Sequence, residues 1–434
     1  MVSFYIENSD SHCLFYYYII ASPDVTTGAR STPIFQTTAY VFEDTDHAAS
    51  LFNLSTFGNI YSRLSNPTTA VLEERIATLE GGRGGTATAS GHSAQLLALF
   101  GLMSPGDRIV SSDKLYGGSI TQFGKTFQKF GWDCTFIDTD NREEVRKALS
   151  SSSAKVLWAE SLANPGGFPQ DIEMLAEEAH AAGIPLIIDN TMATPYLCRP
   201  IEYGADIVVH STTKFISGHG NAMGGMVVDA GTFDWSGSRS GGKKYPSLSE
   251  PEPAYHGLNF QETFGDLAYT TYNHAVGLRD LGPTMSPMNA FLTLTGIETL
   301  NLRMEKHCAN ARVLAEHLES HEKIGHVSFA GLTSSPYYDL SRKYFNGNPG
   351  SVFTVRVNGG YETGASVVER CELFSHLANI GDTRSLILHP ASTTHRQLTA
   401  AQREACGAGD DVLRISVGIE DISDLIKDID FALG

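Results

Sequence analysis

Five short and almost continuously apolar segments follow one another between residues 108 and 211. They read RIVSSD (108–113), CTFID (134–138), KVLWAES (155–161), IPLIIDN (184–190) and DIVVHS (206–211). Strands that are apolar on both faces are typical of a parallel sheet covered by helices on both sides, since neither face meets water. Parallel neighbours also need crossover connections, which fits the helical patterns between the segments. This stretch therefore predicts a mainly parallel α/β sheet.

One connecting segment, DIEMLAEEAHAAG (171–183), predicts a helix that Asp171 caps and Gly183 ends. A second, smaller α/β series follows later in the chain. It consists of a long helix (289–319), a strand (351–359), a helix (365–378), a strand (412–420) and a final helix from Asp421. We therefore expect a boundary between Pro283 and Pro287. The expected parts are an N-terminal extension and arm (1–60), a large domain (61–285) and a smaller C-terminal domain (286–434).

Composition narrows the class of protein. The chain has 434 residues, a hydrophobic fraction of 41% and a charged fraction of 18%, which are typical of a folded enzyme with more than one core. Its net charge of −18 argues against a nucleic-acid partner, which favours clustered Lys and Arg. The six cysteines are scattered without metal-binding spacing, and the apolar run at 13–21 is too short to span a bilayer. We therefore expect a soluble cytoplasmic protein with reduced thiols, no bound metal and no membrane contact.

Polar side chains stand where three of the expected strands end. Lys214 follows the last strand in HSTTKFISGHG (210–220), Asp189 ends the strand before it, and Asn164 lies beyond the third. Because ligands of a parallel α/β sheet collect at this edge, the three residues are candidates for one site. A lysine there can form a Schiff base, a carboxylate can hold a protonated ring nitrogen and hydroxyls nearby suit a phosphate, which together match the needs of pyridoxal phosphate. Taken singly, such a lysine is more often a surface cation, and such an aspartate is often a helix cap.

A turn of small residues is a second candidate part of the phosphate site, besides the hydroxyls near Lys214. Ser90, Gly91 and His92 begin a helical pattern, and backbone N–H groups at a helix start bind anions. The alternative is that Ser90 only caps this helix. Tyr116 lies in the glycine turn KLYGGS (114–119), where its ring could lie flat on a cofactor ring, although a lone tyrosine in a turn usually serves packing.

Several longer motifs, in the same order, resemble the Cys/Met-metabolism family of pyridoxal-phosphate enzymes. They are TTGARSTPIFQTTAYVF, FGNIYSRLSNPT, LEERIATLEGG, DNTMATPYLCRPIEYGADIVVHSTTKFISGHG, EPEPAYHGLNF, SPMNAFLTLTGIETLNLRMEKH, NIGDTRSLILHPASTTH and LRISVGIED. The resemblance runs from about residue 23 to the end of the chain. It implies fold type I, the fold of aspartate aminotransferase, with a large, mainly parallel sheet domain and a smaller C-terminal α/β domain. Residues 1–22 do not resemble the N-terminal arm of the family.

The resemblance also implies roles for single residues. Lys214 matches the Schiff-base lysine, Asp189 the partner of the pyridine nitrogen, and Tyr116 a stacking tyrosine that assists catalysis. The other positions that match cofactor contacts are Ser90, Gly91, His92, Asn164, Thr191, Ser211 and Thr213. Tyr61 and Arg63 match a pair that reaches the phosphate of a neighbouring subunit. This implies a homodimer with shared active sites, usually within a tetramer.

Two further residues match the substrate side of the family's site. Arg414 matches the arginine that grips the substrate carboxylate, a role that suits a fork-shaped guanidinium. Asn379 matches a second contact to the same carboxylate. Without the resemblance, a cross-strand salt bridge is the favoured interpretation of Arg414.

Within the family, two stretches are most similar to members that act on O-acetylhomoserine: GDTRSL, directly after Asn379 and Ile380, and the long segment between Asp234 and Tyr272. The implied reaction is a γ-replacement in which O-acetylhomoserine and sulfide give homocysteine and acetate, a step of methionine and cysteine biosynthesis. The alternatives are an O-acetylserine or O-succinylhomoserine sulfhydrylase, a cystathionine γ-synthase, a methionine γ-lyase, or a relative that keeps the fold without cofactor or catalysis.

Overall fold

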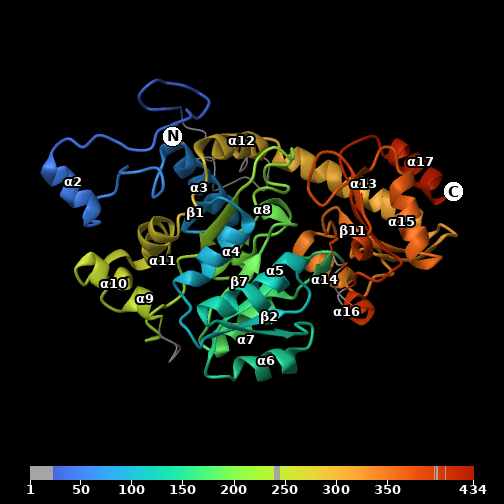
Figure 1. The fold of residues 1–434 in the computed structure, drawn as a ribbon, viewed down its shortest axis with the longest axis horizontal. Helices are drawn as coiled ribbons and strands as arrows, with labels where there is room; N and C mark the ends of the chain where they lie inside the picture. Colours follow the sequence, from blue (N-terminus) through green and yellow to red (C-terminus); the bar gives the residue numbers. More distant parts are fainter. Residues whose placement is uncertain (1–22, 239–244, 395, 397–398, 406) are drawn as a thin grey trace.

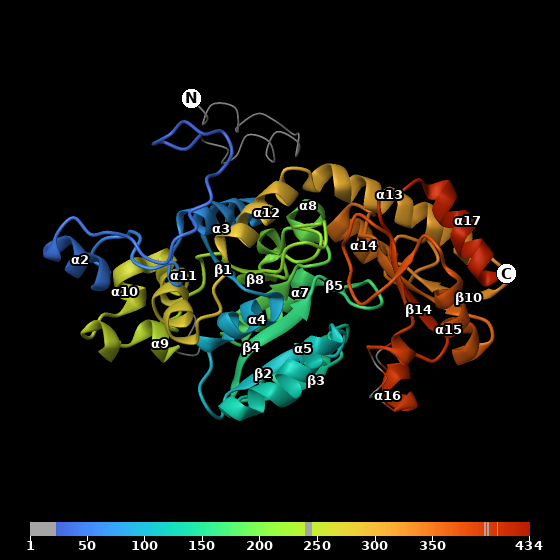
Figure 2. The same ribbon diagram turned by 45° about the horizontal axis from the view of Figure 1, so that its top comes forward.

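The computed structural model describes residues 23–238, 245–394, 396, 399–405 and 407–434, so the unusual segment 1–22 lies outside the described part. Two β-sheets lie side by side, the larger within residues 84–229 and the smaller within residues 324–416 (Figure 1). Helices α12 and α13 run past both of them, as Figure 2 shows from a second direction. The division into an arm and two domains at residues 60 and 285 stays a prediction.

The larger sheet contains seven of the described strands, in the order β1-β9-β8-β7-β4-β2-β3. Their bounds are β1 Gly84–Thr88, β2 Arg108–Ser112, β3 Asp133–Ile137, β4 Ala154–Glu160, β7 Leu186–Asp189, β8 Ile207–His210 and β9 Gly225–Asp229. β3, β2, β4, β7 and β8 pair in parallel, whereas β9 is antiparallel to both of its neighbours, β8 and β1. The prediction of a mainly parallel sheet is confirmed, and each of the five apolar segments forms one parallel strand. A separate pair, β5 Leu162–Ala163 and β6 Phe168–Pro169, follows β4.

The central strands β4, β7 and β8 of the larger sheet are buried on both faces, which is why they are mostly apolar. In β7, Leu186 and Ile188 pack into one core, while Ile187 packs into the core on the opposite face. Helices α3, α7 and α12 supply the first core, and helices α4 and α11 the second. The helices of this part are α2 Thr45–Phe52, α3 Pro67–Glu80, α4 Gly91–Phe100, α5 Gly117–Thr121, α6 Arg142–Leu149, α7 Ile172–Ala181, α8 Thr194–Leu197, α9 Pro246–Ser249, α10 Phe260–Phe264, α11 Ala268–Tyr272 and α12 Pro287–Ile297.

The smaller sheet is mostly antiparallel and has the order β10-β11-β14-β13-β12. Its strands are β10 Ile324–Ser328, β11 Val352–Val357, β12 Ser375–His376, β13 Leu386–Leu388 and β14 Val412–Ser416, and the helices of this part are α13 Leu300–Glu319, α14 Tyr338–Phe345, α15 Gly360–Arg370, α16 Ala400–Ala405 and α17 Ile422–Leu433. Short 3-10 turns span Phe127–Phe130, Pro200–Tyr203, Pro253–Tyr255, Gly265–Leu267 and Pro390–Ser392, and π-helical segments span Gln122–Thr126 and Asn273–Leu281. Within the described ranges, no helix is long and apolar enough to cross a membrane.

The expected single helix over 289–319 is wrong, because the chain forms α12 and α13 with a break at residues 298–299. An unbroken helix would bond the Gly296 carbonyl to the N–H of Leu300. Instead, the guanidinium of Arg303 donates to that carbonyl at 2.7 Å.

Two other local expectations need correction. The helix expected over 365–378 ends at Arg370, and beyond it the carboxylate of Asp428 accepts three successive backbone N–H groups, those of residues 372–374. Asp171 precedes α7 as predicted but its side chain does not cap the helix. Its carboxylate contacts Lys343 and Tyr344 on α14 instead.

The buried carboxyl of Asp229, the last residue of β9, should make the folded protein less stable as the pH rises. Its side chain is buried, and desolvation, reinforced by the nearby charges of Asp206 and Asp266, raises its pKa to about 7. Since the unfolded carboxyl ionises near pH 4, stability falls as the pH rises from about 4 through about 7. We expect Asp229→Asn to be more stable than the parent at pH 8, by up to about 4 kcal/mol, and to match it near pH 4. Urea unfolding at both pH values measures this, and a less stable variant at pH 8 would contradict it.

Candidate active site

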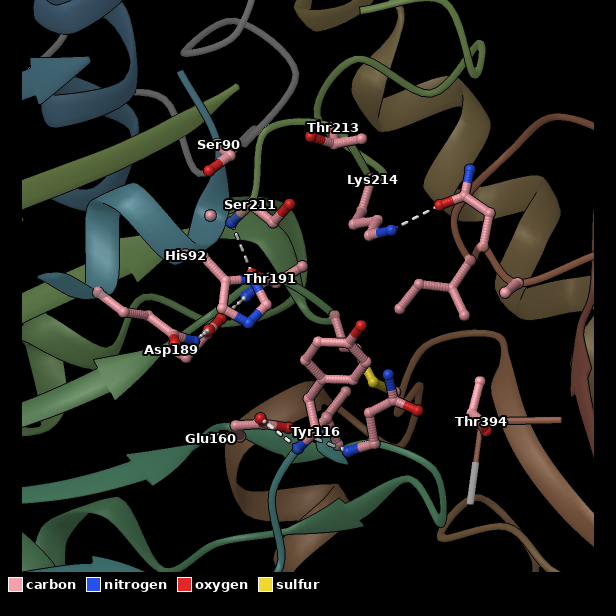
Figure 3. Close-up of a pocket in the computed structure, with 18 of the residues that line it drawn as sticks. Ser90, His92, Tyr116, Glu160, Asp189, Thr191, Ser211, Thr213, Lys214 and Thr394 are labelled. Atoms are coloured by element: carbon pink, nitrogen blue, oxygen red, sulfur yellow. Dashed lines mark hydrogen bonds between the residues drawn. The ribbon is translucent and has the colours of Figure 1, made fainter. Parts of the chain in front are cut away.

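A cavity of about 210 Å³ opens beyond the carboxyl ends of β4, β7 and β8. It is lined by every predicted site residue except Tyr61 and Arg63, namely Ser90, Gly91, His92, Tyr116, Asn164, Asp189, Thr191, Ser211, Thr213, Lys214, Asn379 and Arg414. Figure 3 shows Lys214 and Asp189 on opposite sides of the space, with the ring of Tyr116 projecting between them. Residues that lie far apart in the sequence thus meet beyond the carboxyl ends of the parallel strands, as predicted.

Lys214 lies on a turn that directly follows β8. The turn is closed by backbone bonds from Lys214 N to Ser211 O at 3.2 Å and from Gly218 N to Lys214 O at 2.8 Å. The lysine Nζ projects into the cavity and donates to Asn379 Oδ1 at 2.6 Å (Figure 3). Burial, with the positive charge of Arg414 nearby, lowers its pKa to about 8. About a tenth of this amine is therefore neutral at pH 7 and can act as a nucleophile.

Asp189 ends β7 and is almost fully buried. Its carboxylate accepts the Thr191 N–H at 3.0 Å, and Gln95 Nε2 lies 3.5 Å away. Desolvation raises its pKa, although these hydrogen bonds and the nearby His210 act in the opposite direction. Among the described residues, none forms an ion pair with Asp189 in the way that His180 pairs with Asp206. Asp189 is thus a buried carboxylate that a cationic ligand would stabilise.

The N-terminus of α4 faces the same cavity. Ser90 is its N-cap, and the Ser90 Oγ accepts the Ser93 N–H at 3.2 Å, as in the capping alternative. Gly91 must be glycine here, since an added Cβ would lie 2.7 Å from the Cβ of Ser211. This close approach places the hydroxyl of Ser211 beside the helix start, where backbone N–H groups suit an anion. The Thr213 hydroxyl is already bonded to the backbone of Gly224.

Glu160, the last residue of β4, holds two cavity residues at once. Its Oε1 accepts the backbone N–H of Tyr116 at 2.7 Å, and its Oε2 accepts that of Asn164 at 3.0 Å (Figure 3). Burial, together with the neighbouring charge of Asp189, raises its pKa well above the ordinary value. The ring of Tyr116 is also in edge contact with His92, at 5.9 Å between centroids.

Glu160→Gln should weaken the hydrogen bonds that position Tyr116 and Asn164, with almost no change in side-chain volume. The amide offers only one acceptor oxygen and turns an N–H group toward the second backbone N–H, so Tyr116 or Asn164 loses its anchor. We expect kcat/KM to fall about 10- to 100-fold and the cofactor to bind more weakly. Steady-state kinetics and fluorescence titration of the apoprotein with cofactor measure this. The exposed Glu143→Gln serves as control, and unchanged values for Glu160→Gln would refute the anchoring role.

Arg414 reaches the cavity from β14 in the smaller sheet, and its guanidinium is buried. It donates to Asn164 Oδ1 at 3.3 Å and to the carbonyl of Asn379 at 3.0 Å. Desolvation lowers its pKa to about 10. The salt bridge favoured in the absence of the family resemblance is not formed within the described residues. The guanidinium is therefore able to receive an anionic group from the cavity.

Tyr61 and Arg63 lie outside this chain's own cavity. Tyr61 is 42% exposed, and the guanidinium of Arg63 lies over its ring at 5.5 Å from the centroid. Arg63 also donates to the carbonyl of Arg279, and its own carbonyl accepts from Thr284. Their action in the site of a neighbouring subunit stays a prediction.

The cavity also contains residues that the sequence prediction missed, among them Gln95, Met192, Met223, Ile380 and Thr394. Gln95 had a usable signal, since it lies one helical turn beyond Gly91 on the same face of α4. Glu160 had a usable signal too, since it stands near the end of the apolar segment KVLWAES (155–161). Met223 and Thr394 come from loops, where no periodic pattern indicates which way a side chain points.

These residues fit pyridoxal phosphate on three structural grounds. Lys214 offers a partly neutral amine in the cavity, and Asp189 offers a buried carboxylate that forms no ion pair within the described residues. The close packing of Gly91 against Ser211 leaves a helix start and a hydroxyl for a phosphate. Among the described residues, Lys214 is the one lysine that lines the cavity.

Comparison with known proteins supports the same interpretation. The model of the family described as Cys/Met metabolism PLP-dependent enzyme matches residues 19–434. A protein of Leptospira meyeri named O-acetyl-L-homoserine sulfhydrylase is 47% identical over 95% of this chain and 94% of its own length. A Saccharomyces cerevisiae protein named homocysteine/cysteine synthase is 44% identical over 92% of each chain.

A solved structure agrees as well. The crystal structure of a Campylobacter jejuni protein assigned as an O-acetylhomoserine (thiol)-lyase superposes with a TM-score of 0.92 and 38% identity, covering 96% of this chain and 98% of that one. It contains N'-pyridoxyl-lysine-5'-monophosphate, a lysine that carries the cofactor. Together with the cavity around Lys214, these matches establish that the chain belongs to the Cys/Met metabolism family of PLP-dependent enzymes.

Proposed function

We propose that this chain catalyses a γ-replacement in which O-acetylhomoserine and sulfide give homocysteine and acetate. The observation that carries the proposal is one cavity that combines the Lys214 amine with a buried carboxylate, Asp189, and a buried guanidinium, Arg414, neither of which is ion-paired within the described chain. The names of the relatives, O-acetyl-L-homoserine sulfhydrylase and homocysteine/cysteine synthase, support this choice of substrates. The product places the enzyme in methionine biosynthesis.

Each residue of the cavity has a distinct task in this reaction. Pyridoxal phosphate, when bound, supplies an electron sink for negative charge at the substrate carbons beside it. Lys214 holds the cofactor covalently at rest and, once the substrate amine has displaced it, accepts the α-proton at Nζ. Asp189 keeps the ring nitrogen protonated by a charge-assisted hydrogen bond. Arg414 and Asn379 bind the substrate carboxylate, and Tyr116 assists proton movement.

The remaining predicted contacts bind and orient the cofactor. Ser90, Gly91 and His92 at the start of α4, with the hydroxyl of Ser211, receive its phosphate, and the Thr213 hydroxyl joins them by releasing its bond to the Gly224 carbonyl. Asn164 lies where it can contact the ring oxygen, and Glu160 holds its backbone in place. Thr191 donates its N–H to Asp189 and its hydroxyl accepts the Ser211 N–H at 2.8 Å, so it links the two sides of the site.

The test is homocysteine formation by the purified, cofactor-loaded protein given O-acetylhomoserine and sulfide. Parallel assays use O-acetylserine or O-succinylhomoserine with sulfide, cysteine as sulfur donor, and methionine alone. A clear preference for O-acetylhomoserine with sulfide is the expected result. Preference for another pair would move the chain to an O-acetylserine or O-succinylhomoserine sulfhydrylase, a cystathionine γ-synthase or a methionine γ-lyase. A colourless protein that cannot be loaded with cofactor would indicate a non-catalytic relative.

The proposed assembly is a cytoplasmic homodimer with shared active sites, arranged further as a tetramer. It is supported by the location of Tyr61 and Arg63 outside their own cavity and by exposed apolar side chains in the segment that precedes them. Val41 is 98% exposed and Phe57 is 70% exposed, which is unusual for large apolar residues unless a partner covers them. Sedimentation analysis of the parent and of Tyr61→Ala with Arg63→Ala measures the assembly and its link to cofactor binding.

A further inference from the structure

Three buried polar side chains form a line along one face of α13. Arg303, His307 and Asn310 are spaced by four and three residues, so they stack on the same side of the helix. Each is less than 5% exposed, and none lines the cavity. Burying polar groups is costly unless they are hydrogen-bonded, so their partners indicate what they do.

Arg303 binds open carbonyls at the end of α12 and at the end of the turn that carries Lys214. Its Nη1 donates to Phe215 O at 2.7 Å, and its Nη2 donates to Gly296 O at 2.7 Å and to Ile216 O at 3.3 Å. Phe215 and Ile216 directly follow Lys214, at the end of the turn that carries it. Within the described chain Arg303 forms no ion pair, so these carbonyl dipoles balance its charge. A cation is favourable at such C-terminal carbonyls.

Gly218 makes this arrangement possible. It has a φ of +75°, which favours glycine, and an added Cβ would lie 2.1 Å from Nη1 of Arg303. The turn therefore closes with a residue that leaves the guanidinium in direct contact with the backbone. The Gly218 carbonyl also accepts the Thr383 N–H at 2.9 Å, which joins the turn to the segment that follows Asn379.

His307 and Asn310 bind the backbone that follows β14, on the side of the site that carries Arg414. His307 Nδ1 donates to Val417 O at 2.7 Å, and Asn310 Nδ2 donates to the carbonyls of Gly418 at 3.0 Å and Glu420 at 2.9 Å. These carbonyls follow β14, the strand that carries Arg414. Burial lowers the pKa of His307 to about 4, so its ring is neutral and Nδ1 carries the proton. α13 runs from the end of α12 along the smaller sheet and so spans both segments (Figure 2).

We propose that Arg303, His307 and Asn310 are positioning residues that set the distance between Lys214 and Arg414. The inference deepens the proposed function, because it rests on the roles given there to these two residues. Lys214 must reach the α-carbon of the substrate while Arg414 holds the carboxylate on that same carbon, so their separation has little tolerance. The two residues belong to different sheets, and the polar line on α13 is attached to the backbone next to each.

The proposal predicts opposite kinetic signatures for the two ends of the line. Arg303→Met should lower kcat about 10- to 100-fold and shift the pH midpoint of the absorbance of the bound cofactor, with little change in KM, because it displaces Lys214. Arg303→Lys should recover part of the parental kcat and part of the parental absorbance midpoint, because it keeps the positive charge. His307→Phe and Asn310→Leu should raise KM and the dissociation constant of L-norleucine, an amino acid without a leaving group, about 10-fold. Lys306→Met, an exposed cation on the same helix, is the control.

A merely structural role gives a different result. The variants would then yield less folded, cofactor-loaded protein, but the loaded fraction would keep the parental kcat, KM, absorbance midpoint and norleucine affinity, and this outcome overturns the proposal. The absorbance and norleucine measurements do not require O-acetylhomoserine to be the substrate. O-acetylhomoserine and sulfide could give no homocysteine while Arg303→Met still shifts the absorbance midpoint and His307→Phe and Asn310→Leu still weaken norleucine binding. In that case the proposed substrate is wrong and the positioning role stands.

Discussion

Lys214→Ala is expected to abolish turnover and covalent cofactor attachment together. The variant removes both the amine that holds the cofactor and the base that takes the α-proton, so the rate of homocysteine formation should fall by at least about 10³-fold. Lys214→Arg should be equally inactive, because a guanidinium stays protonated and cannot form the covalent link. Steady-state assays, with mass spectrometry after borohydride reduction to detect the attached cofactor, measure both effects.

The control is Lys129→Ala, which removes an exposed lysine from the turn Phe127–Phe130. It should retain parental activity and one attached cofactor per chain. Substantial homocysteine synthesis by Lys214→Ala, or cofactor attached to another lysine, would contradict the assignment. Because Nζ of Lys214 bonds to Asn379 and, among the described residues, to no carboxylate, its loss breaks no buried ion pair there, and the variant should remain folded.

Asp189→Asn is expected to separate function from stability. The amide keeps the size of the side chain and can still accept the Thr191 N–H, but it supplies no negative charge opposite a protonated ring nitrogen. We expect kcat to fall about 10²- to 10³-fold and the cofactor to bind more weakly. Kinetics and absorbance spectra of the loaded variant measure this loss.

The stability of the apoprotein should move the other way. Burial raises the pKa of Asp189, so the parent loses stability as the pH rises through the folded-state pKa, and the amide avoids this loss. Apo Asp189→Asn should therefore unfold at the same or a higher temperature than the apo parent at pH 8. The control, Asp206→Asn, removes a buried carboxylate that bonds His180 and the Leu186 N–H at the opposite end of the sheet. It should leave kcat of the loaded protein unchanged, and a loss of kcat as large as that of Asp189→Asn would refute the specific role of Asp189.

Much of the larger sheet could be predicted from the sequence, because burial on both faces leaves a local mark. Segments such as 184–190 and 206–211 have an uninterrupted apolar middle, and each forms a parallel strand close to its predicted bounds. The order of these strands then places their carboxyl ends at one edge. Lys214 and Asp189 were found by this rule alone, and both line the cavity.

Contacts between side chains and the backbone decided the features that the local pattern missed. The break after α12 depends on Arg303, which lies within the expected helix and whose guanidinium binds the carbonyl of Gly296. The early end of α15 depends on Asp428, which belongs to α17 and accepts three backbone N–H groups. In both places a side chain satisfied backbone groups that a regular helix would have used.

The sequence by itself determined the five parallel strands of the larger sheet, the lysine and the carboxylate at their ends, and through its motifs the family. Only the tertiary structure decided that Glu160 anchors Tyr116 and Asn164, that Arg414 reaches across from a second sheet without an ion pair in the described chain, and that α13 joins the two sides of the site. The physical reason is that some interactions shape the local sequence pattern and others do not. Burial imposes a local periodicity along the chain, whereas a hydrogen bond between residues 250 positions apart, such as Arg414 to Asn164, leaves none.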